Sequence, residues 1–165
     1  SETVIALDYR DEMKSPIEAK KLFYAHRIMS TLFPYNFPRF LITYGAHKNN
    51  NFASGSLRQT IEPLLHTGVD IVEGHNTLDS DAQFPFRKVI ETYYALNIPI
   101  IIDRFGGNFM KDKAGGVFYI DKIMIDPALT WQRDKIKKYM KENKYSELEI
   151  KIVLNSIERL EQLNR

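Results

Sequence analysis

The chain has 165 residues, 23 basic and 21 acidic, with a formal net charge of +2 and no cysteine. This length favours one domain, and 44% hydrophobic with 27% charged residues is ordinary for a globular protein rather than a disordered one. The lack of cysteine excludes disulfides, thiolate zinc sites and cysteine nucleophiles, and the near-balanced charge gives no broad basic surface for nucleic acid.

The N-terminal part predicts a strand, a helix and a second strand. Thr3–Tyr9 is apolar and β-prone. The helix is predicted over 16–33, because apolar residues recur at spacings of three and four, and two prolines follow. Its start has the pattern of a capping box, in which Ser15 caps the first amides and Glu18 reaches back. Phe40–Tyr44 is predicted to be the second strand.

The middle of the chain predicts polar loops and two helices. His47–Ser56 is rich in Asn, Ser and Gly and is expected to be a loop, whereas Leu57–His66 favours a helix. Gly68–Val72 fits a helix or a strand, and Glu73–Gln83 is expected to be a second polar loop. Phe86–Leu96 is predicted to be a helix with one apolar side.

The C-terminal part predicts a hairpin followed by two helices. An apolar run, Ile98–Ile102, comes first. Phe109–Lys111 and Val117–Ile120 flank a glycine-containing turn and are predicted to pair as a hairpin. Helices are predicted over 127–143 and 146–163, the second with the capping box Ser-Glu-Leu-Glu at its start.

Three side chains with oxygen ligands border the predicted hairpin. Asp103 ends the apolar run, Asn108 enters the first hairpin strand, and Asp121 follows the second. If the strands pair, Asn108 and Asp121 lie side by side, and Gly106 and Gly107 allow a loop tight enough to bring Asp103 alongside. Two carboxylates and an amide oxygen suit a hard cation such as Mg²⁺. The sequence therefore predicts a magnesium site at this end of the hairpin.

This pattern of Asp-x4-Asn, strand, Gly turn, strand and Asp resembles the catalytic-loop and metal-loop region of the protein-kinase-like fold. It is most similar to small atypical members such as aminoglycoside phosphotransferases and RIO-type kinases. The upstream strand, capped helix and strand resemble the lower part of a kinase N-lobe, with Pro16–Phe33 in the place of its αC helix. The resemblance implies an α+β fold, a reduced kinase-like domain over 1–165, with 1–46 as an N-lobe-like portion and 47–165 as a mostly helical C-lobe-like portion.

The same resemblance implies an activity and a role for each residue. It would make the chain a Mg²⁺- and ATP-dependent phosphotransferase acting on a hydroxyl of a protein or a small molecule. Asp103 would be the catalytic acid, and Asn108 and Asp121 would bind the metal. The basic side chains nearest in sequence, Arg104 and Lys122, are candidates for neutralising the nucleotide phosphates.

Several positions depart from the kinase pattern and favour a second hypothesis. The position of the phosphate-pairing lysine holds Asp8, or Arg10 with a two-residue shift, and no Gly-rich phosphate loop is among the residues before it. Ile101 stands where kinases have histidine, and Asp121 is followed by 122–123, Lys-Ile, instead of Phe-Gly. The second hypothesis is a catalytically inactive, pseudokinase-type module that binds a partner protein.

A third hypothesis comes from the basic penultimate helix. Its basic residues are Arg133, Lys135, Lys137, Lys138 and Lys141. A run of this kind is typical of a solvated helix face, and in some proteins it binds nucleic acid. The chain could thus be an RNA-associated protein, although the near-neutral net charge counts against it.

Other notable side chains favour structural roles. His26 lies on the apolar stripe of its helix and is expected to be a satisfied core histidine. The aromatic residues around two prolines are expected to form a packed connection rather than a platform for bases; they are Phe33, Tyr35, Phe37 and Phe40. The remaining histidines have no metal-ligand spacing; they are His47, His66 and His75.

The sequence also bears on localisation. No apolar run approaches the roughly 20 residues of a membrane-spanning helix. The first residues lack the basic start and long apolar stretch of a signal peptide. We therefore expect a cytoplasmic protein without membrane contact.

Overall fold

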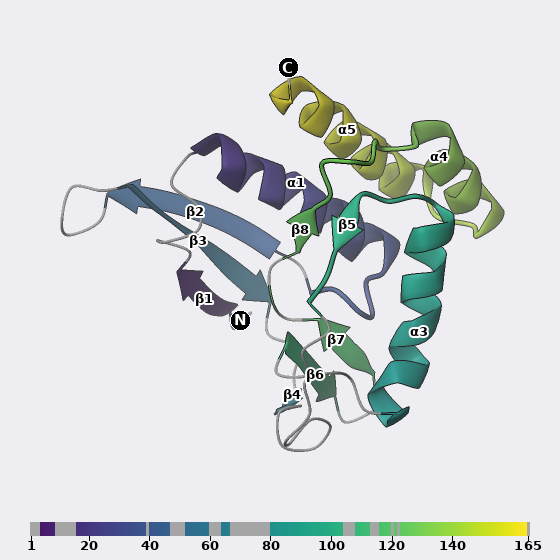
Figure 1. The fold of residues 1–165 in the computed structure, drawn as a ribbon, viewed down its shortest axis with the longest axis horizontal. Coiled ribbons are helices and arrows are strands. Elements are labelled where there is room, and N and C mark those ends of the chain that lie inside the picture. Colours follow the sequence, from purple (N-terminus) through teal and green to yellow (C-terminus); the bar gives the residue numbers. More distant parts are fainter. Residues whose placement is uncertain are drawn as a thin grey trace.

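The computed structural model is a mixed α+β fold (Figure 1). It describes residues 4–8, 16–38, 40–46, 52–59, 64–66, 80–103, 108–112, 116–119, 121 and 123–164. Its helices are α1 (Pro16–Leu32), α3 (Ser80–Ala95), α4 (Arg133–Glu142) and α5 (Glu147–Leu163). Its strands are β1 (Val4–Asp8), β2 (Phe40–Ala46), β3 (Phe52–Gln59), β4 (Leu64–His66), β5 (Ile100–Ile101), β6 (Phe109–Asp112), β7 (Val117–Tyr119) and β8 (Met124–Ile125).

The first three strands form an antiparallel sheet in the order β1-β3-β2. Strand β3 is central, with Leu7 opposite Ser56 on one side and Thr43 opposite Gly55 on the other. Helix α1 connects β1 to β2 and lies between β2 and α5 (Figure 1). The predicted order of strand, helix and strand is therefore confirmed. The predicted cap residue Ser15 lies outside the described residues.

Two predictions for the segment after β2 are wrong. The loop predicted over 47–56 gives way to β3 at Phe52, and the helix predicted over 57–66 is replaced by the end of β3 and by β4. Strand β3 forms ladder hydrogen bonds with a neighbour on each side, and such pairing overrides local propensity. The segment 68–72 lies outside the described residues.

Two helix starts also differ from prediction. Helix α3 begins at Ser80 rather than Phe86, so that the end of the loop predicted over 73–83 is helical. Pro85 lies beyond the first turn of this helix, so its missing N–H costs one intrahelical hydrogen bond. Helix α4 begins at Arg133 rather than residue 127, because the Asp126 carboxylate accepts the Ala128 N–H at 2.9 Å and forms a turn.

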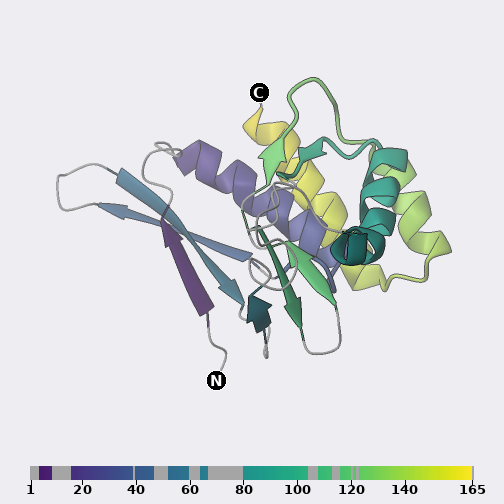
Figure 2. The ribbon, with the colours of Figure 1, turned by 60° about the horizontal axis from the view of Figure 1, so that its bottom comes forward.

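The predicted hairpin is present. Strands β6 and β7 pair antiparallel with Phe109 opposite Tyr119, and β4 extends this sheet on the β6 side. The hairpin and β4 are seen together beside the first sheet in Figure 2. Strand β5 pairs with β8, with Ile101 opposite Met124. The apolar run that leads to Asp103 is thus anchored by the segment that follows the hairpin.

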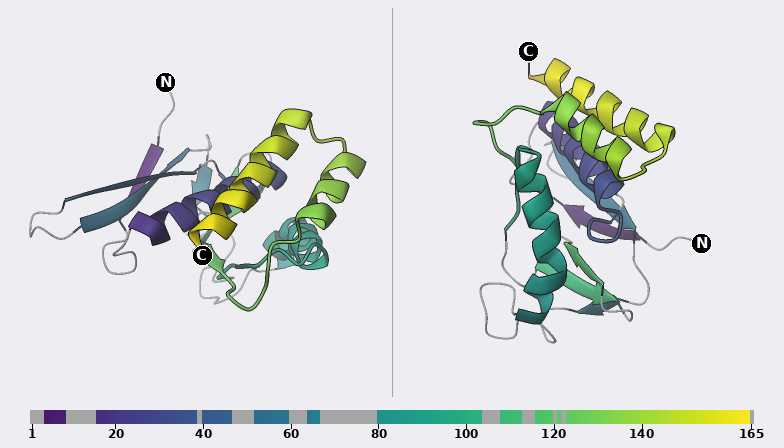
Figure 3. Two further views of the ribbon diagram at one scale, coloured as in Figure 1. Left: turned by 90° about the horizontal axis from the view of Figure 1, so that it is seen from above. Right: turned by 90° about the vertical axis from the view of Figure 1, so that its right-hand side faces the viewer.

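One hydrophobic core joins α1, α3, the hairpin, α4 and α5. Figure 3 shows α4 and α5 as neighbouring helices, with α5 along α1. The predicted capping box of α5 is confirmed, since Ser146 Oγ accepts the Glu149 N–H at 3.1 Å and Glu149 Oε1 accepts the Ser146 N–H at 2.9 Å. No helix in the described ranges has the length and apolar character to span a membrane.

Candidate functional site

Asp103 is placed at the surface by the strand that precedes it. Burial alternates along the extended chain, with Ile100 and Ile102 buried and Ile101 and Asp103 exposed. The side-chain Nδ2 of Asn108 donates a hydrogen bond to the Asp103 carbonyl oxygen at 3.1 Å. This bond connects the two ends of the segment 103–108. It also leaves Asn108 Oδ1, an acceptor oxygen, available for another partner.

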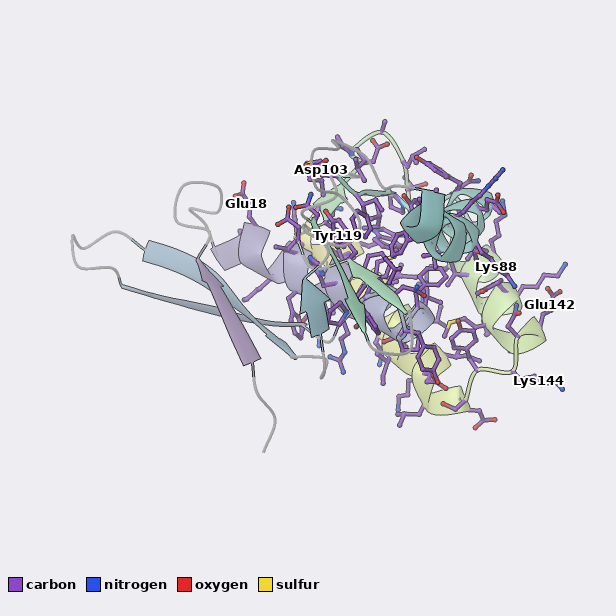
Figure 4. The ribbon with its side chains drawn as sticks, turned by 90° about the horizontal axis from the view of Figure 1, so that it is seen from below. Glu18, Lys88, Asp103, Tyr119, Glu142 and Lys144 are labelled. Carbon is purple, nitrogen blue, oxygen red and sulfur yellow. The ribbon has the colours of Figure 1, made fainter. Side chains whose placement is uncertain are left out.

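Tyr119 on β7 fixes the backbone of Asp103 from a second direction. Its hydroxyl accepts the Asp103 N–H at 3.2 Å, and its side chain is only 1% exposed. Figure 4 shows the two labelled residues close together. The amide and the carbonyl of Asp103 are therefore both bonded to side chains of the hairpin region.

Asp121 lies at the same end of the hairpin as Asn108. Phe109 and Tyr119 are opposite each other, so Asn108 directly precedes the first pair and Asp121 follows its partner strand by two residues. The Asp121 side chain is half-buried. Asn108, which is bonded to Asp103, and Asp121 therefore belong to the same end of the hairpin.

The segment that contains Asp121 is anchored on each side. Before it, the Tyr119 N–H donates to the Asn36 carbonyl at 2.8 Å, and Asn36 Nδ2 donates to the Val117 carbonyl at 3.2 Å. After it, the Ile123 N–H donates to His26 Nε2 at 3.0 Å. His26 is 3% exposed, so the prediction of a buried, satisfied histidine is confirmed.

A cluster of aromatic rings supports the hairpin from within the core. Phe109 packs edge-on against Phe86 at 5.1 Å and against Tyr119 at 5.3 Å between ring centroids. Phe37 lies 5.8 Å from Tyr119 and 5.7 Å from Phe86. These contacts join the turn after α1, the helix α3 and both hairpin strands into one support beneath the site.

The aromatic prediction for the turn after α1 is right in part. Phe33 and Phe37 are buried, as a packed connection requires. Tyr35 is 79% exposed, so it is not part of that packing; it follows Pro34 in a turn at the surface. The Phe40 side chain lies outside what the structure describes.

Some predicted phosphate-binding residues cannot be placed. Arg104 and Lys122, and the alternative Arg10, lie outside the described residues. Asp8, the other residue at the kinase lysine position, is the last residue of β1 and pairs with Gly55. Glu18 lies exposed in the first turn of α1.

The donor set fits Mg²⁺ better than a metal that needs a dense cage. Among the described residues, no group of three or more His, Cys, Asp or Glu side chains is arranged to hold a metal. Mg²⁺ usually takes one or two carboxylates and keeps waters or substrate oxygens as its other ligands. The Asp121 carboxylate and Asn108 Oδ1 are oxygen donors of this kind, and Asn108 is bonded to the Asp103 carbonyl.

The basic side chains of α4 are all exposed. Lys138 pairs with Glu142 at 3.9 Å, and both are well exposed, so this pair adds little to stability. Figure 4 shows Glu142 and Lys144, at the end of this helix, well away from Asp103. The basic face and the Asp103 site are therefore separate surfaces.

Three residues of the site region have roles that sequence reasoning missed. Tyr119 and Asn36 were not candidates, and His26 was assigned to the core without a partner. Their contacts join positions 16, 81 and 97 residues apart. No local pattern encodes such pairs, although a histidine on an apolar helix stripe signals a specific buried partner.

Comparisons with models of protein families, with curated protein sequences and with solved structures found no match to this chain. A proposal for its function therefore depends on the residues and contacts described above.

Proposed function

We propose that this chain is a reduced protein-kinase-like phosphotransferase that binds Mg²⁺ and ATP and transfers the γ-phosphoryl group to a hydroxyl. The main supporting observation is the hydrogen bond from Asn108 Nδ2 to the Asp103 carbonyl, at the start of a hairpin that leads to Asp121. This bond orients the side-chain amide of Asn108 and leaves its Oδ1 for a cation. Asn108 is bonded to the backbone of Asp103 and lies at the same end of the hairpin as Asp121.

The order of the elements also supports the proposal. A strand, a packed helix and a strand come first, and a helix, the strand β5, Asp103, a hairpin and Asp121 follow. In protein kinases a catalytic-loop Asp comes five residues before a metal-binding Asn, and a second metal-binding Asp comes later in the chain. The residues Asp103, Asn108 and Asp121 follow the same order and, for the first two, the same spacing.

The proposed mechanism assigns one task to each polar group. Asn108 Oδ1 and the Asp121 carboxylate would hold Mg²⁺, which neutralises phosphate charge when it is bound with ATP. The exposed carboxylate of Asp103 would orient the acceptor hydroxyl and accept its proton as the hydroxyl oxygen attacks the γ-phosphorus and ADP leaves. Tyr119 would keep the Asp103 backbone in position. The acceptor is a hydroxyl of a protein or a small molecule.

Which basic residue binds the phosphates of ATP is a separate proposal. By the resemblance, the position of the usual lysine holds Asp8, the last residue of β1, or Arg10, and Arg104 and Lys122 are the basic residues nearest the site in sequence. Alanine replacement of each, followed by ATP titration, tests this assignment. Unchanged ATP affinity in both variants would exclude it.

The absence of a lysine at either of these two positions, Asp8 and Arg10, also favours the second hypothesis, a pseudokinase-type module for a partner protein. Tight binding of a protein without nucleotide would support it. The RNA hypothesis has the exposed basic residues of α4 in its favour and predicts binding that weakens steeply with salt. Both remain alternatives to the phosphotransferase.

The decisive experiment is a titration of ATP, with and without Mg²⁺, followed by thermal unfolding of the wild type and of Asp121→Ala. A ligand that binds only the native state stabilises it by about 2.7 kcal/mol at 100 times its Kd. We expect a Mg²⁺-dependent rise in Tm in the wild type and none in Asp121→Ala. Asp134→Ala, which removes an exposed acid from α4, is the matched control and should behave as wild type.

No shift in the wild type at millimolar ATP would reject the phosphotransferase. The binding-module hypothesis would then become the better account, with the three polar residues as caps of loops and strands.

A further inference from the structure

Helix α1 has no lysine partner on β1. In protein kinases, an ion pair between a strand lysine and a glutamate of the αC helix must form together with the metal-binding Asp, so the helix and the metal site are coupled. Here the strand ends at Asp8, and Glu18 lies exposed in the first turn of α1. If α1 is coupled to the site, another contact has to do it.

His26 provides a direct contact between α1 and the segment of Asp121. Its Nε2 accepts the Ile123 N–H at 3.0 Å, and both residues are buried. A nitrogen that accepts a hydrogen bond has no proton, so this neutral imidazole has its proton on Nδ1. Helix α1 also packs against β8, the strand that begins directly after Ile123.

Together with a contact from Asn36, this hydrogen bond anchors the backbone on both sides of Asp121. On the near side, Asn36 in the turn after α1 bonds the backbone of Tyr119. On the far side, His26 bonds Ile123. The five residues from Tyr119 to Ile123 are therefore fixed at both ends by one helix and its turn. A displacement of α1 along the hairpin would move Asp121 relative to Asn108, which is held by Asp103 instead.

We propose that His26 is a positioning residue for the metal-binding carboxylate of Asp121, and that it couples α1 to the cation site. The proposal rests on the function proposed above. A residue behind a metal ligand typically changes metal affinity by roughly 10–100-fold when it is replaced.

Two replacements at the same position test it. His26→Leu keeps an apolar side chain in the core but removes the acceptor, whereas Gln in His26→Gln can offer an amide oxygen near the place of Nε2. We expect His26→Leu to raise the Mg²⁺ concentration for half-maximal ATP binding by about 10-fold or more. We expect His26→Gln to restore most of that affinity, with kcat at saturating Mg²⁺ close to wild type in both.

A second readout follows the contact itself. The amide hydrogen of Ile123 should exchange faster in His26→Leu and return toward the wild-type rate in His26→Gln. Ile136→Val, which removes one buried methyl group from α4, is the stability control and should change neither quantity. Should His26→Leu fail to fold, His26→Ala replaces it, because alanine favours the helix.

The positioning role would be overturned if His26→Leu had the same Mg²⁺ dependence as the wild type. It would also be overturned if His26→Gln were as impaired as His26→Leu. A wild type that does not respond to Mg²⁺ and ATP would instead reject the proposed function. In that case the exchange rate of the Ile123 amide still tests the hydrogen bond from Ile123 to His26, because this measurement needs no ligand. The failure of the proposed function and the failure of the positioning role can therefore be told apart.

Discussion

The two acids of the site are held by different parts of the molecule. Asp103 is bonded to residues close in sequence, since Asn108 is 5 residues away and Tyr119 is 16 away. The segment of Asp121 is bonded to α1 and its turn, and the His26–Ile123 contact spans 97 residues.

The segment of Asp103 is thus organised by local contacts, whereas the segment of Asp121 depends on how α1 packs against the rest of the fold. Contacts between near neighbours survive small movements of distant elements, whereas contacts across the fold are lost when those elements separate. A loosened α1 would therefore disturb the proposed metal ligand Asp121 first and leave Asp103 in place. Under the proposed function, cation binding is the step most sensitive to the docking of α1.

The largest expected effect is on kcat, and it distinguishes the role proposed for Asp103 from that proposed for Asp121. Asp103→Asn removes the group that is proposed to accept the proton, so kcat should fall by roughly 10²–10⁴-fold under the proposed function. The Mg²⁺-dependent rise in Tm with ATP should persist, in contrast to its loss in Asp121→Ala. Steady-state phosphoryl transfer and thermal unfolding measure the two quantities. A loss of ATP binding in Asp103→Asn would show that the halves are not independent.

The next effect concerns the cluster of aromatic rings that packs beneath both parts of the candidate site. Phe109 is fully buried between Phe86 and Tyr119, so Phe109→Ala should lower the free energy of unfolding by about 3–5 kcal/mol. Urea unfolding measures this loss. Phe109→Leu keeps more of the apolar volume and should cost less than Phe109→Ala; an equal cost would mean that the ring contacts, and not the apolar volume, provide the stabilisation.

A smaller effect should be confined to the Asp103 half. Tyr119→Phe keeps the buried ring but removes the acceptor of the Asp103 N–H, which costs about 1 kcal/mol. We expect kcat to fall by roughly 5–10-fold, the rate equivalent of that energy. The Mg²⁺ requirement should not change, because the proposed function assigns Mg²⁺ binding to Asp121 and Asn108. A shift in the Mg²⁺ requirement alone would contradict the division between the halves.

The smallest effect concerns α1 and is visible as a pH dependence. The Tyr145 hydroxyl donates a hydrogen bond to the carbonyl of Leu32, the last residue of α1. Burial, and then the neighbouring Tyr139, raise the pKa of Tyr145 above its ordinary value of about 10. The stabilisation from this group is thus complete below about pH 10 and is lost as the pH rises through the folded-state pKa.

We expect Tyr145→Phe to be less stable than wild type by about 1 kcal/mol at neutral pH. Above about pH 10 the difference should shrink, since the wild type alone loses this contribution. Denaturant unfolding of both proteins across this range measures the difference and cancels the titration of other tyrosines and lysines. A difference that grows with pH would contradict the assigned direction.

Local signals predicted much of the fold. The helix from Pro16, the hairpin from Phe109 and the capped helix after Ser146 follow from periodicity, a glycine turn and a capping box, each encoded within a few residues. The wrong predictions have non-local causes. Residues 57–59 are extended because β3 pairs on both sides, and residues 127–128 form a turn set by Asp126.

The site shows the same limit. Spacing was enough to predict that Asn108 and Asp121 lie at one end of a hairpin, because a hairpin brings near neighbours together; that they form a metal site with Asp103 stays a prediction. The supports of Tyr119 and Ile123 come from Asn36 and His26, whose partners are chosen by how α1 docks. That docking depends on the packing of the whole core, which no motif in the sequence states.

The contact of α1 with α5 also sets an order of events during synthesis. Tyr145 and Leu32 are 113 residues apart, and α5 follows Tyr145 directly. At 5–20 residues per second, the ribosome needs roughly 5–25 s to proceed from the end of α1 to the start of α5. During that interval the apolar side of α1 that α5 will cover has no partner from α5. This side of α1 therefore reaches its final packing only after α5 has been synthesised.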